Sequence, residues 1–517
     1  FWVLWGTLLF AATRTTSPLA RRLLTLAAVL ATLQLAAEVL VLGRWVNYSS
    51  ILSLGTQVLF IVAVGVVVLA CFVDRWGRRN SSDLQASWNA TFAAAFVSLC
   101  IVMGTSIAAG RSLLLADVVI GAHYYSWFPE NWKAGYVGEQ MEPPILPAIG
   151  QYRSDDPAVF PQHLAWARSS GINLIIFDWW PDRVAVKRRI LDNVHRTDGA
   201  WHGMRFAIHY ETLDLKTPEK EPRPGEPANM LVLDEGRAQR MAKHWEHIAR
   251  TYMDDPAYFR VDGRPVLFLY ATRHVLGDVR RYVAEAREHV LQTTGQRLFL
   301  VGDEVYFNVP TLAPDGTPIL LPEQQPDWSR LSAFDAITGY NPFDSSRKEH
   351  AGSAGRARFL ADVAALYDRY RRVAHAAGQM FIPTVLPGYN DRGVRLATDH
   401  FVVPRQGPSP GESFFEEALR QWALPFLDEQ HPMLAVTSWN EWNEGTQIEP
   451  TRPSPETNRD RSESGDRFSA GEILSGYGCR NLVVLRRFFA SPGAAAGTRG
   501  ADECLAELLG SGVPGVP

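Results

Sequence analysis

Two glutamates three residues apart, Glu441 and Glu444, follow a short run of apolar and β-branched residues at 434–437. Such a run predicts a strand, and Gly445 ends the strand-like pattern. Two tryptophans and several amides surround the carboxylates in the string SWNEWNEGTQIEP, which spans residues 438–450. Paired carboxylates carry out acid–base work on glycosidic bonds, and aromatic faces hold sugar rings. The string therefore indicates a carbohydrate site, with an ordinary solvated loop as the alternative interpretation.

The spacing of the two carboxylates bears on the stereochemistry of bond cleavage. If the turn is helical, side chains three positions apart lie roughly 5–6 Å from each other at Cβ. That separation is nearer to the spacing of retaining glycosidases than to the wider spacing of inverting ones, which leaves room for a water. The spacing therefore favours a retaining reaction.

Alternating strand and helix patterns begin at Asp117 and must position these groups. Eight candidate strands lie at 118–124, 172–179, 205–210, 265–270, 297–301, 333–340, 380–386 and 433–438. The clearest amphipathic helices lie at 158–170, 238–252, 275–291, 357–376 and 413–427. This α/β pattern predicts a (β/α)8 TIM-type barrel, and a doubly wound open sheet is the alternative. The first strand is not followed by a glycine-rich phosphate fingerprint, which argues against a nucleotide site there.

In a parallel barrel, functional side chains belong at the carboxyl ends of the strands. Polar and aromatic residues gather at these ends of the predicted strands. An acidic, aromatic-lined site suits neutral sugars, whose C–H faces stack on rings and whose hydroxyls bind carboxylates. The candidate substrate-binding residues are His123, Tyr124, Tyr125, Trp127, Asp178, Trp179, Trp180, His209, Glu211, Tyr270, Glu304, Tyr340, Tyr389, Arg392, Asn440 and Trp442.

Four of these residues, His123, Asp178, His209 and Glu211, are also of types that bind metal ions. No two of them have a tight ligand spacing such as His-x-x-x-His, so hydrogen bonding to hydroxyls is the favoured interpretation. We expect neither a metal nor a cofactor. No Gly-x-Ser-x-Gly elbow lies near a strand end, so a serine hydrolase is not indicated.

The first 112 residues differ in composition and predict an all-α membrane region. Residues 23–43, 51–73 and 92–110 are apolar over about 20 positions each, the length that spans a bilayer. Residues 1–12 are interpreted as a truncated first span, which makes about four transmembrane helices. We therefore expect a membrane region at 1–112, the barrel at 117–490 and a loosely held tail at 491–517.

Arginines set the expected orientation of these spans. The loops between the first and second spans and between the third and fourth carry Arg14, Arg21, Arg22, Arg75, Arg78 and Arg79. By the positive-inside rule both loops face the cytoplasm, so the barrel is expected on the extracytoplasmic side. The chain is thus predicted to be a multi-pass membrane protein in contact with lipid. Its net charge of −4 does not indicate nucleic acid as a partner.

The string at 438–450 closely resembles the terminal motif of the endo-α-mannosidase family, glycoside hydrolase family 99, and of its bacterial relatives from polysaccharide gene clusters. Other pieces resemble the same family in the same order: GAHYYSWF at 121–128, YRSDDPAVF at 152–160, INLIIFDWW at 172–180, DGRPVLFLY at 262–270 and LPGYNDRGVR at 386–395. The resemblance covers roughly residues 118–449. It implies an endo-acting α-mannosidase that does not call for a catalytic metal.

By this resemblance, Glu441 is the base that acts on the mannose 2-hydroxyl, whose oxygen attacks the anomeric carbon to form a 1,2-anhydro sugar. Glu444 protonates the leaving oxygen and then activates water, so the bond within the chain is cleaved with retention. These roles require Glu444 to be held protonated, by burial or by its neighbour's charge. The chain departs from the family at Asn443, where histidine is common, and in a shortened loop at 130–150. Both departures bear on sugar specificity.

Two other functions remain as alternatives. Relatives in polysaccharide clusters have been labelled glycosyltransferases, but residues 178–182 do not match the Asp-x-Asp diphosphate site of a nucleotide-sugar transferase. The second alternative is a catalytically inactive glycan-binding module, tethered to a membrane assembly for polysaccharide synthesis or export. The presence of both Glu441 and Glu444 argues against an inactive module.

Overall fold

The computed structural model describes residues 118–197, 201–216, 230–305, 311–312, 318–319, 328–343, 348–395, 402–406 and 413–489. The predicted membrane region at 1–112 and the predicted tail at 491–517 therefore lie outside the described residues. Within the described ranges, no helix combines the length and the apolar character that crossing a bilayer requires.

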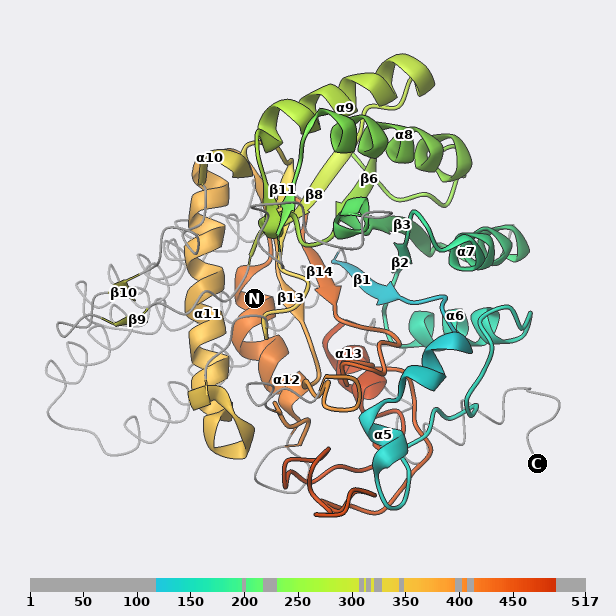
Figure 1. Ribbon diagram of the computed structural model, residues 1–517, viewed down its shortest axis with the longest axis vertical. Helices are drawn as coiled ribbons and strands as arrows, with labels where there is room; N and C mark the ends of the chain where they lie inside the picture. The colour runs from blue at the N-terminus through green and yellow to red at the C-terminus, as the bar shows by residue number, and fades with distance from the viewer. Residues whose placement is uncertain are drawn as a thin grey trace, which may run out of the picture. The chain divides into compact units, whose positions relative to one another are not determined.

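A sheet of parallel strands forms the centre of the described fold (Figure 1). Its strands follow one another in the order β12-β11-β8-β6-β3-β2-β1-β14-β13. Their bounds are β1 (Val119–Tyr124), β2 (Leu174–Trp179), β3 (Arg205–Tyr210), β6 (Arg264–Leu269), β8 (Phe299–Asp303), β11 (Ala336–Thr338), β12 (Met380–Ile382), β13 (Thr384–Val385) and β14 (Met433–Val436). Each of the predicted strands is present, and β3 has the bounds that its sequence predicts.

The two ends of this strand order are consecutive pieces of the chain, so the sheet is nearly closed into a TIM-like barrel. β12 pairs with β11 while β13 pairs with β14, and Pro383 separates the two pieces. Proline has no backbone N–H to donate to a ladder, which explains the interruption. The Pro383 carbonyl still accepts a 3.0 Å hydrogen bond from the Ala435 N–H. The barrel prediction is confirmed to this extent, and the doubly wound open sheet is not the fold that forms.

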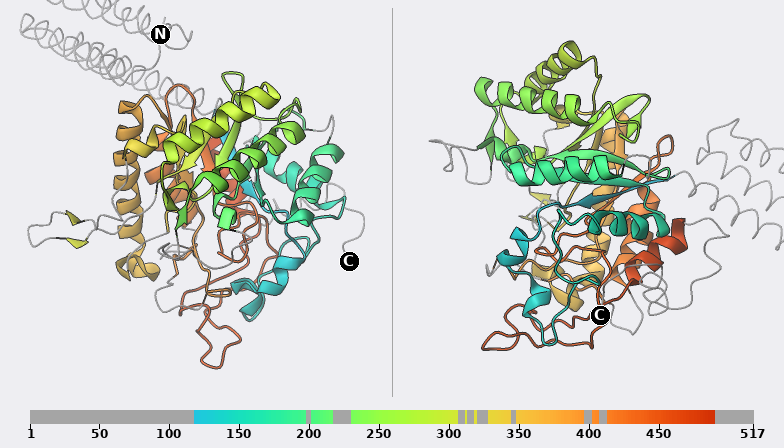
Figure 2. Two further views of the ribbon diagram at one scale, coloured as in Figure 1. Left: turned by 45° about the horizontal axis from the view of Figure 1, so that its top comes forward. Right: turned by 90° about the vertical axis from the view of Figure 1, so that its right-hand side faces the viewer.

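Helices connect the strands and surround the sheet (Figure 1). The longer ones are α6 (Val159–Ser169), α7 (Val184–Arg196), α8 (Glu235–Tyr252), α9 (Val279–Thr294), α11 (Gly352–Ala376) and α13 (Arg480–Phe489). Asp234 and Asp278 cap α8 and α9 by accepting hydrogen bonds from backbone N–H groups of the first turn, at 3.0 and 3.2 Å. Such caps satisfy donors that the helix itself leaves unpaired. α8 and α9 then pack against each other on the outside of the sheet (Figure 2).

Shorter elements complete the described fold. The short helices are η1 (Glu130–Ala134), α5 (Val137–Gln140), η2 (Thr212–Lys216), η3 (Thr272–His274), α10 (Trp328–Leu331), η5 (Lys348–His350), α12 (Phe414–Ala418), η6 (Leu419–Ala423) and η7 (Leu424–Phe426). The short strands are β4 (Leu231–Val232), β5 (Arg260–Val261), β7 (Val275–Leu276), β9 (Thr311–Leu312) and β10 (Pro318–Ile319).

Two helical segments differ from the regular helices that the sequence predicts. The segment predicted at 413–427 changes along its length from an α-helix, α12, to a π-helical turn, η6, and a 3-10 turn, η7. Pro425 accounts for this change because its ring clashes with the carbonyl four residues earlier. The sequence also predicts a helix around 473–489, but the last helix begins at Arg480, so residues 473–479 are not part of it. Gly476 and Gly478 lie in that stretch and disfavour a helix.

Asp335 fastens the amino-terminal end of β11 to its neighbours. Its Oδ1 lies 2.7 Å from Arg264 Nη1, and its Oδ2 accepts hydrogen bonds from Arg287 Nη2 and the Leu300 N–H at 2.8 and 2.9 Å. Donors left without this carboxylate would each lose a charge-assisted hydrogen bond.

We expect Asp335→Ala to lower the free energy of unfolding by about 2 kcal/mol, because it leaves these donors unpaired in a partly buried place. Chemical denaturation measures the change. Glu285→Ala is the matched control, since Glu285 pairs with Arg281 at 3.0 Å on the exposed face of α9. That pair is expected to contribute less than about 1 kcal/mol. Equal losses in the two variants would contradict the role given to Asp335.

Candidate active site

The interior of the barrel changes from apolar to polar over a single step of two residues along its strands. The apolar layer includes Ile176, Ala207, Val301, Ala336, Ile382 and Ala435. Because alternate residues of a strand share a face, the residues two positions further on also point inward. These residues are Asp178, His209, Asp303, Thr338, Thr384 and Thr437. The polar layer therefore lies at the carboxyl ends of the strands, where the sequence predicted the site.

Two histidines and two tyrosines form a compact ring cluster in this layer. The His123 ring centroid lies 4.6 Å from that of His209 and 4.9 Å from that of Tyr340. The Tyr270 ring lies 5.5 Å from His209 and 5.4 Å from Tyr340. Burial, and then the neighbouring His209, lowers the pKa of His123, which keeps its imidazole neutral. Within the described part of the chain neither ring nitrogen of His123 has a hydrogen-bond partner, so both remain for a ligand.

An acidic pair adjoins the histidines. Asp178 Oδ1 lies 3.4 Å from His209 Nδ1, and Trp180 Nε1 donates a hydrogen bond to Asp178 Oδ2. Burial raises the pKa of Glu211, and the charge of Asp178 and a hydrogen bond with it raise that pKa further. Two buried carboxyl groups this close are stable when one of them carries a proton. The pair can therefore both donate to and accept from hydroxyl groups.

Aromatic side chains border the polar layer. Trp127 stacks on Tyr125 with ring centroids 4.3 Å apart, and its indole lies 6.3 Å from that of Trp180. The guanidinium carbon of Arg183 lies 3.8 Å from the Trp180 ring centroid. Trp127 and Trp180 are half-buried, so part of each indole remains available to solvent. These surfaces suit the C–H faces of a sugar.

A tight turn after β14 presents the two glutamates. The Thr437–Ser438 peptide that leads into it is cis. Ser438 Oγ accepts a 2.7 Å hydrogen bond from the Glu441 N–H, and Glu441 Oε1 accepts a 2.9 Å bond from the Asn443 N–H. Gly445 follows with a φ of +64°, and a Cβ at this position would lie 3.0 Å from Asn390 backbone atoms. Only glycine meets both conditions without strain, so it closes the turn.

The two glutamates have different surroundings. Glu441 is 3% exposed, and burial raises its pKa, with a further rise from the charge of Glu444. The Glu444 side chain is 15% exposed, and its Oε1 lies 2.9 Å from Arg395 Nη1. A guanidinium at this distance stabilises the charged form of a carboxylate. The two carboxyl groups therefore differ in their burial and in their charged partner.

Tyr340 lies beside both carboxylates. Burial raises its pKa, and the charges of Glu444 and Glu441 raise it further, so the phenol remains protonated. Its hydroxyl forms a hydrogen bond with the Tyr125 hydroxyl. Burial and then Glu211 and Glu444 likewise raise the pKa of Tyr270. Two protonated phenols thus accompany the carboxylate pair.

Four of the predicted binding residues lie outside this cluster. Tyr124 and Trp179 occupy the strand positions that face the helices: the Tyr124 hydroxyl bonds to His163 Nδ1 at 3.0 Å, and Trp179 stacks on Tyr210 with centroids 5.9 Å apart. Asn440 is fully buried and exchanges hydrogen bonds with the Tyr125 backbone at 2.8 and 3.0 Å. Trp442 is buried in an aromatic cluster with Phe128, Trp132, Tyr136 and Tyr152. These four residues support the site and do not line its polar layer.

The remaining predicted residues lie at its margin. Tyr389 stacks on Phe343 with centroids 3.7 Å apart, and its hydroxyl donates to Asp391 Oδ2 at 3.1 Å. Glu304 Oε2 lies 2.6 Å from Arg330 Nη2, so this carboxylate is already paired. Arg392 Nε donates a 2.7 Å hydrogen bond to the Arg467 carbonyl.

Two residues that order the site are absent from the list of candidate residues. Arg395 contacts Glu444 and also lies 3.1 Å from Asp391 Oδ2, a partner four residues earlier. Asp303 accepts hydrogen bonds from the Tyr340 N–H and the Ala271 N–H at 3.0 and 2.9 Å, which fixes the backbone beside both phenols. The four-residue spacing of Asp391 and Arg395 was visible in the sequence, and the inward strand position of Asp303 followed from the two-residue alternation.

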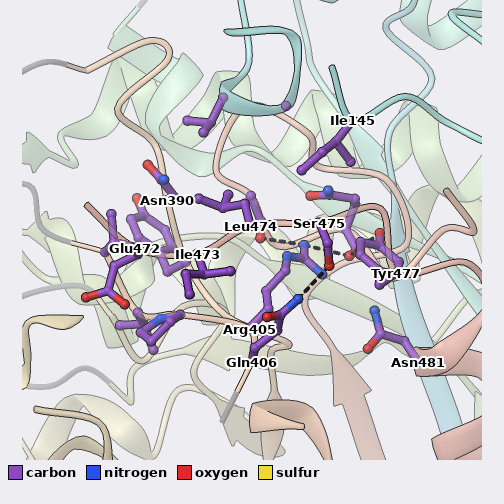
Figure 3. A pocket seen from close by; sticks show the side chains of 18 of the residues that line it. Ile145, Asn390, Arg405, Gln406, Glu472, Ile473, Leu474, Ser475, Tyr477 and Asn481 are labelled. Atoms are coloured by element: carbon purple, nitrogen blue, oxygen red, sulfur yellow. Dashed lines mark hydrogen bonds between the residues drawn. The ribbon is translucent and has the colours of Figure 1, made fainter. Parts of the chain in front are cut away.

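A separate pocket borders the same turn but is not lined by Glu441 or Glu444 (Figure 3). Arg405 points along it and donates hydrogen bonds to the carbonyls of Gly445 and Gln447 at 2.6 and 2.8 Å. The guanidinium also lies 4.8 Å from the Tyr477 ring. Arg405 therefore supports the turn that carries the two glutamates from the pocket side. Across the described residues, no three His, Cys, Asp or Glu side chains are grouped so that they could hold a metal ion.

Comparisons with known proteins agree with the resemblance that the motifs indicated. The chain is 22% identical over 381 residues to glycoprotein endo-alpha-1,2-mannosidase of Rattus norvegicus, covering 66% of this chain and 69% of that protein. It is 25% identical over 360 residues to the glycoprotein endo-alpha-1,2-mannosidase-like protein of Homo sapiens, covering 64% and 65%. The chain thus spans about two thirds of the length of these curated relatives.

One solved structure supports the fold. A "Glycoside hydrolase-like protein" matches with a TM-score of 0.50 at 19% identity, covering 72% of this chain and 94% of that one. The family model described as "Glycosyltransferase WbsX" matches residues 133–457. This match covers more than half of the 517-residue chain. The chain therefore belongs to the WbsX family, and its sequence is related to the endo-α-mannosidases of glycoside hydrolase family 99.

Proposed function

We propose that the chain is an endo-acting, retaining glycoside hydrolase that cleaves α-mannosidic or similar bonds within a polysaccharide. The observation that carries the proposal is that Glu441 and Glu444 lie together on one turn, beside Tyr340 of the polar layer. Two carboxyl groups placed together in this way carry out the acid and base work of glycosidases. The similarity to endo-α-1,2-mannosidases supports the choice of sugar class.

The proposed reaction follows the roles that the resemblance gives to the two residues. Glu441 takes the proton of the sugar 2-hydroxyl, and that oxygen attacks the anomeric carbon while Glu444 protonates the leaving oxygen. Glu444 then takes a proton from water, which opens the 1,2-anhydro sugar, and Glu441 returns its proton to the 2-oxygen. Glu444 can donate only when protonated, so Arg395 has to release it as substrate binds.

The surrounding side chains supply recognition of hydroxyls and ring faces. His123 and the Asp178–Glu211 pair offer donors and acceptors to hydroxyl groups. The half-buried indoles of Trp127 and Trp180 provide stacking surfaces. We assign these residues to substrate binding, together with Tyr270 and Tyr340 beside the carboxylates.

We also propose that the barrel is held at a membrane by several spans in residues 1–112 and works on the extracytoplasmic side. The apolar runs and the arginine-bearing loops of that region support this location. A site outside the cytoplasm suits a polysaccharide at the cell surface as substrate. Protease accessibility of the barrel in sealed vesicles of known orientation measures its side, and protection in right-side-out vesicles would contradict the proposal.

Glycosyl transfer is the second candidate, because the family model is described as a glycosyltransferase. A retaining carboxylate pair can pass the sugar to water or to another hydroxyl, so both outcomes share the first step. Nucleotide sugars as donors distinguish the two functions. Product formed from a nucleotide sugar and an acceptor glycan, without release of oligosaccharides from polymer, would favour the transferase.

We expect Glu441→Gln and Glu444→Gln each to lower kcat for release of oligosaccharides by at least about 100-fold, the usual effect of removing an acid–base group. The substrates are α-mannans and bacterial surface polysaccharides, with products separated by chromatography. Glu463→Gln is the control, because Glu463 is exposed on a loop and is not among the candidate site residues. Glycan binding that persists in a protein that cuts nothing, with both variants equal to the parent, would support the inactive module.

The Arg395 contact generates a pH prediction. Arg395 lowers the pKa of Glu441 against the effect of burial, and it contacts Glu444 directly. Removing a positive charge makes a carboxyl group harder to ionise, so its pKa rises and its protonated form persists to higher pH. We expect Arg395→Gln to move the pH profile of kcat/KM to higher pH by roughly one unit. Arg420→Gln, on an exposed pair with Glu416, is expected to leave the profile in place. A shift to lower pH in Arg395→Gln would refute the assigned charge effect.

A further inference from the structure

One buried carboxylate, Glu449, contacts the turn that carries Glu441 and Glu444. Glu449 is fully buried, and its Oε2 accepts hydrogen bonds from the Tyr152 hydroxyl at 2.9 Å and from Trp442 Nε1 at 3.0 Å. Its Oε1 lies 3.1 Å from Nε2 of the equally buried His163. Two donors therefore hold one oxygen of this carboxylate, and the His163 imidazole lies beside the other.

These three side chains come from different parts of the fold. His163 belongs to α6, and Tyr152 belongs to the segment between β1 and α6. Trp442 lies within the turn itself, between Glu441 and Glu444. The carboxylate thus closes the segment 442–449 on itself and fastens it to two other segments.

The two phenols nearest to Glu449 and His163 remain protonated. Burial, and then the charge of Glu449, raises the pKa of Tyr152, so its hydroxyl remains a donor. Burial and then Glu449 raise the pKa of Tyr124 in the same way, and its hydroxyl meets His163 Nδ1 at 3.0 Å. The two ring nitrogens of His163 therefore lie against different groups, Nδ1 against the Tyr124 hydroxyl and Nε2 against Glu449. Tyr152 in turn accepts a 3.0 Å hydrogen bond from Asn440 Nδ2, which also binds the Tyr125 backbone.

We propose that Glu449 and His163 are a positioning pair that sets the direction of Glu441 and Glu444 through Trp442. The inference rests on the proposed function, because it concerns the same two carboxylates. Trp442 packs in the aromatic cluster. The two glutamates that flank it at 441 and 444 lie beside Tyr340 of the polar layer. Glu449 touches no reacting atom in this arrangement. Its effect is on the geometry in which the reacting groups are held.

A second carboxylate–histidine pair, in which Asp428 is buried and His375 is exposed, provides a comparison. Asp428 Oδ2 lies 3.1 Å from His375 Nε2, and Asp428 Oδ1 accepts hydrogen bonds from the Gln430 and His431 N–H groups at 2.9 and 3.1 Å. This pair precedes β14, whereas Glu449 follows it, so the two pairs lie toward opposite ends of the same strand. Asp428→Asn removes a similar interaction without touching the turn.

The experiment compares the full-length parent with Glu449→Gln, His163→Gln, Asp428→Asn and Glu441→Gln. Steady-state kinetics give kcat and KM, and hydrogen exchange followed by mass spectrometry reports on the backbone of the turn. Glutamine removes the negative charge and replaces one acceptor oxygen by an NH2 group, so the charge-assisted hydrogen bonds to Tyr152 and Trp442 are weakened. We expect Glu449→Gln to lower kcat by about 100-fold with KM within about twofold, the effect of a misplaced catalytic group. We also expect faster exchange at 441–445, a smaller change of the same kind in His163→Gln, and neither effect in Asp428→Asn.

The outcomes separate this inference from the proposed function. Parental kcat and parental exchange at 441–445 in Glu449→Gln would overturn the inference while leaving the hydrolase intact. Equal losses of kcat in Glu449→Gln and Asp428→Asn, with exchange raised throughout the barrel, would also overturn the inference. Glu449 and His163 would then contribute only to the stability of the fold. If Glu449→Gln does not fold, His163→Gln decides by the same two readouts. Hydrolysis that persists in Glu441→Gln would instead contradict the proposed function. Hydrogen exchange at 441–445 in Glu449→Gln would then decide whether Glu449 orders the turn.

Discussion

The alternation of side chains along parallel strands is the constraint on which the rest of this structure depends. Inside a nearly closed barrel a side chain cannot reach bulk water, so the interior is apolar until the strands end. The change from Ile176 to Asp178 and from Ala207 to His209 occurs in one step. Every polar group beyond that step has to find a partner in the protein or in a ligand. The carboxyl ends of the strands are therefore where chemistry becomes possible.

Electrostatics then divide the two glutamates of the turn. Glu441 is enclosed, while Glu444 lies against a guanidinium from the segment after β13. The two carboxylates are three residues apart, yet their environments come from different parts of the chain. Paired carboxyl groups that divide acid and base roles need surroundings that differ in this way.

Much of the fold followed from sequence, because a strand needs only a local pattern. The run at 205–210 gives β3 its observed bounds, and the string after β14 predicts a functional turn. Which face a residue occupies was harder to predict. Tyr124 lies beside His123 in sequence but faces the helices, and the two-residue alternation at a strand end becomes ambiguous where the strand stops. Long-range pairs such as Arg395–Glu444 and Glu449–His163 depend on how distant loops meet, which no local pattern contains.

Residue 443 holds Glu441 through its backbone N–H group and not through its side chain. Asn443 stands where related sequences commonly carry histidine, yet the atom that holds Glu441 is the backbone N–H of this residue. Any amino acid except proline supplies that atom. The position of the Glu441 carboxylate consequently does not depend on which side chain stands at 443. The side chain at 443 can therefore change while the main chain keeps Glu441 in the same place.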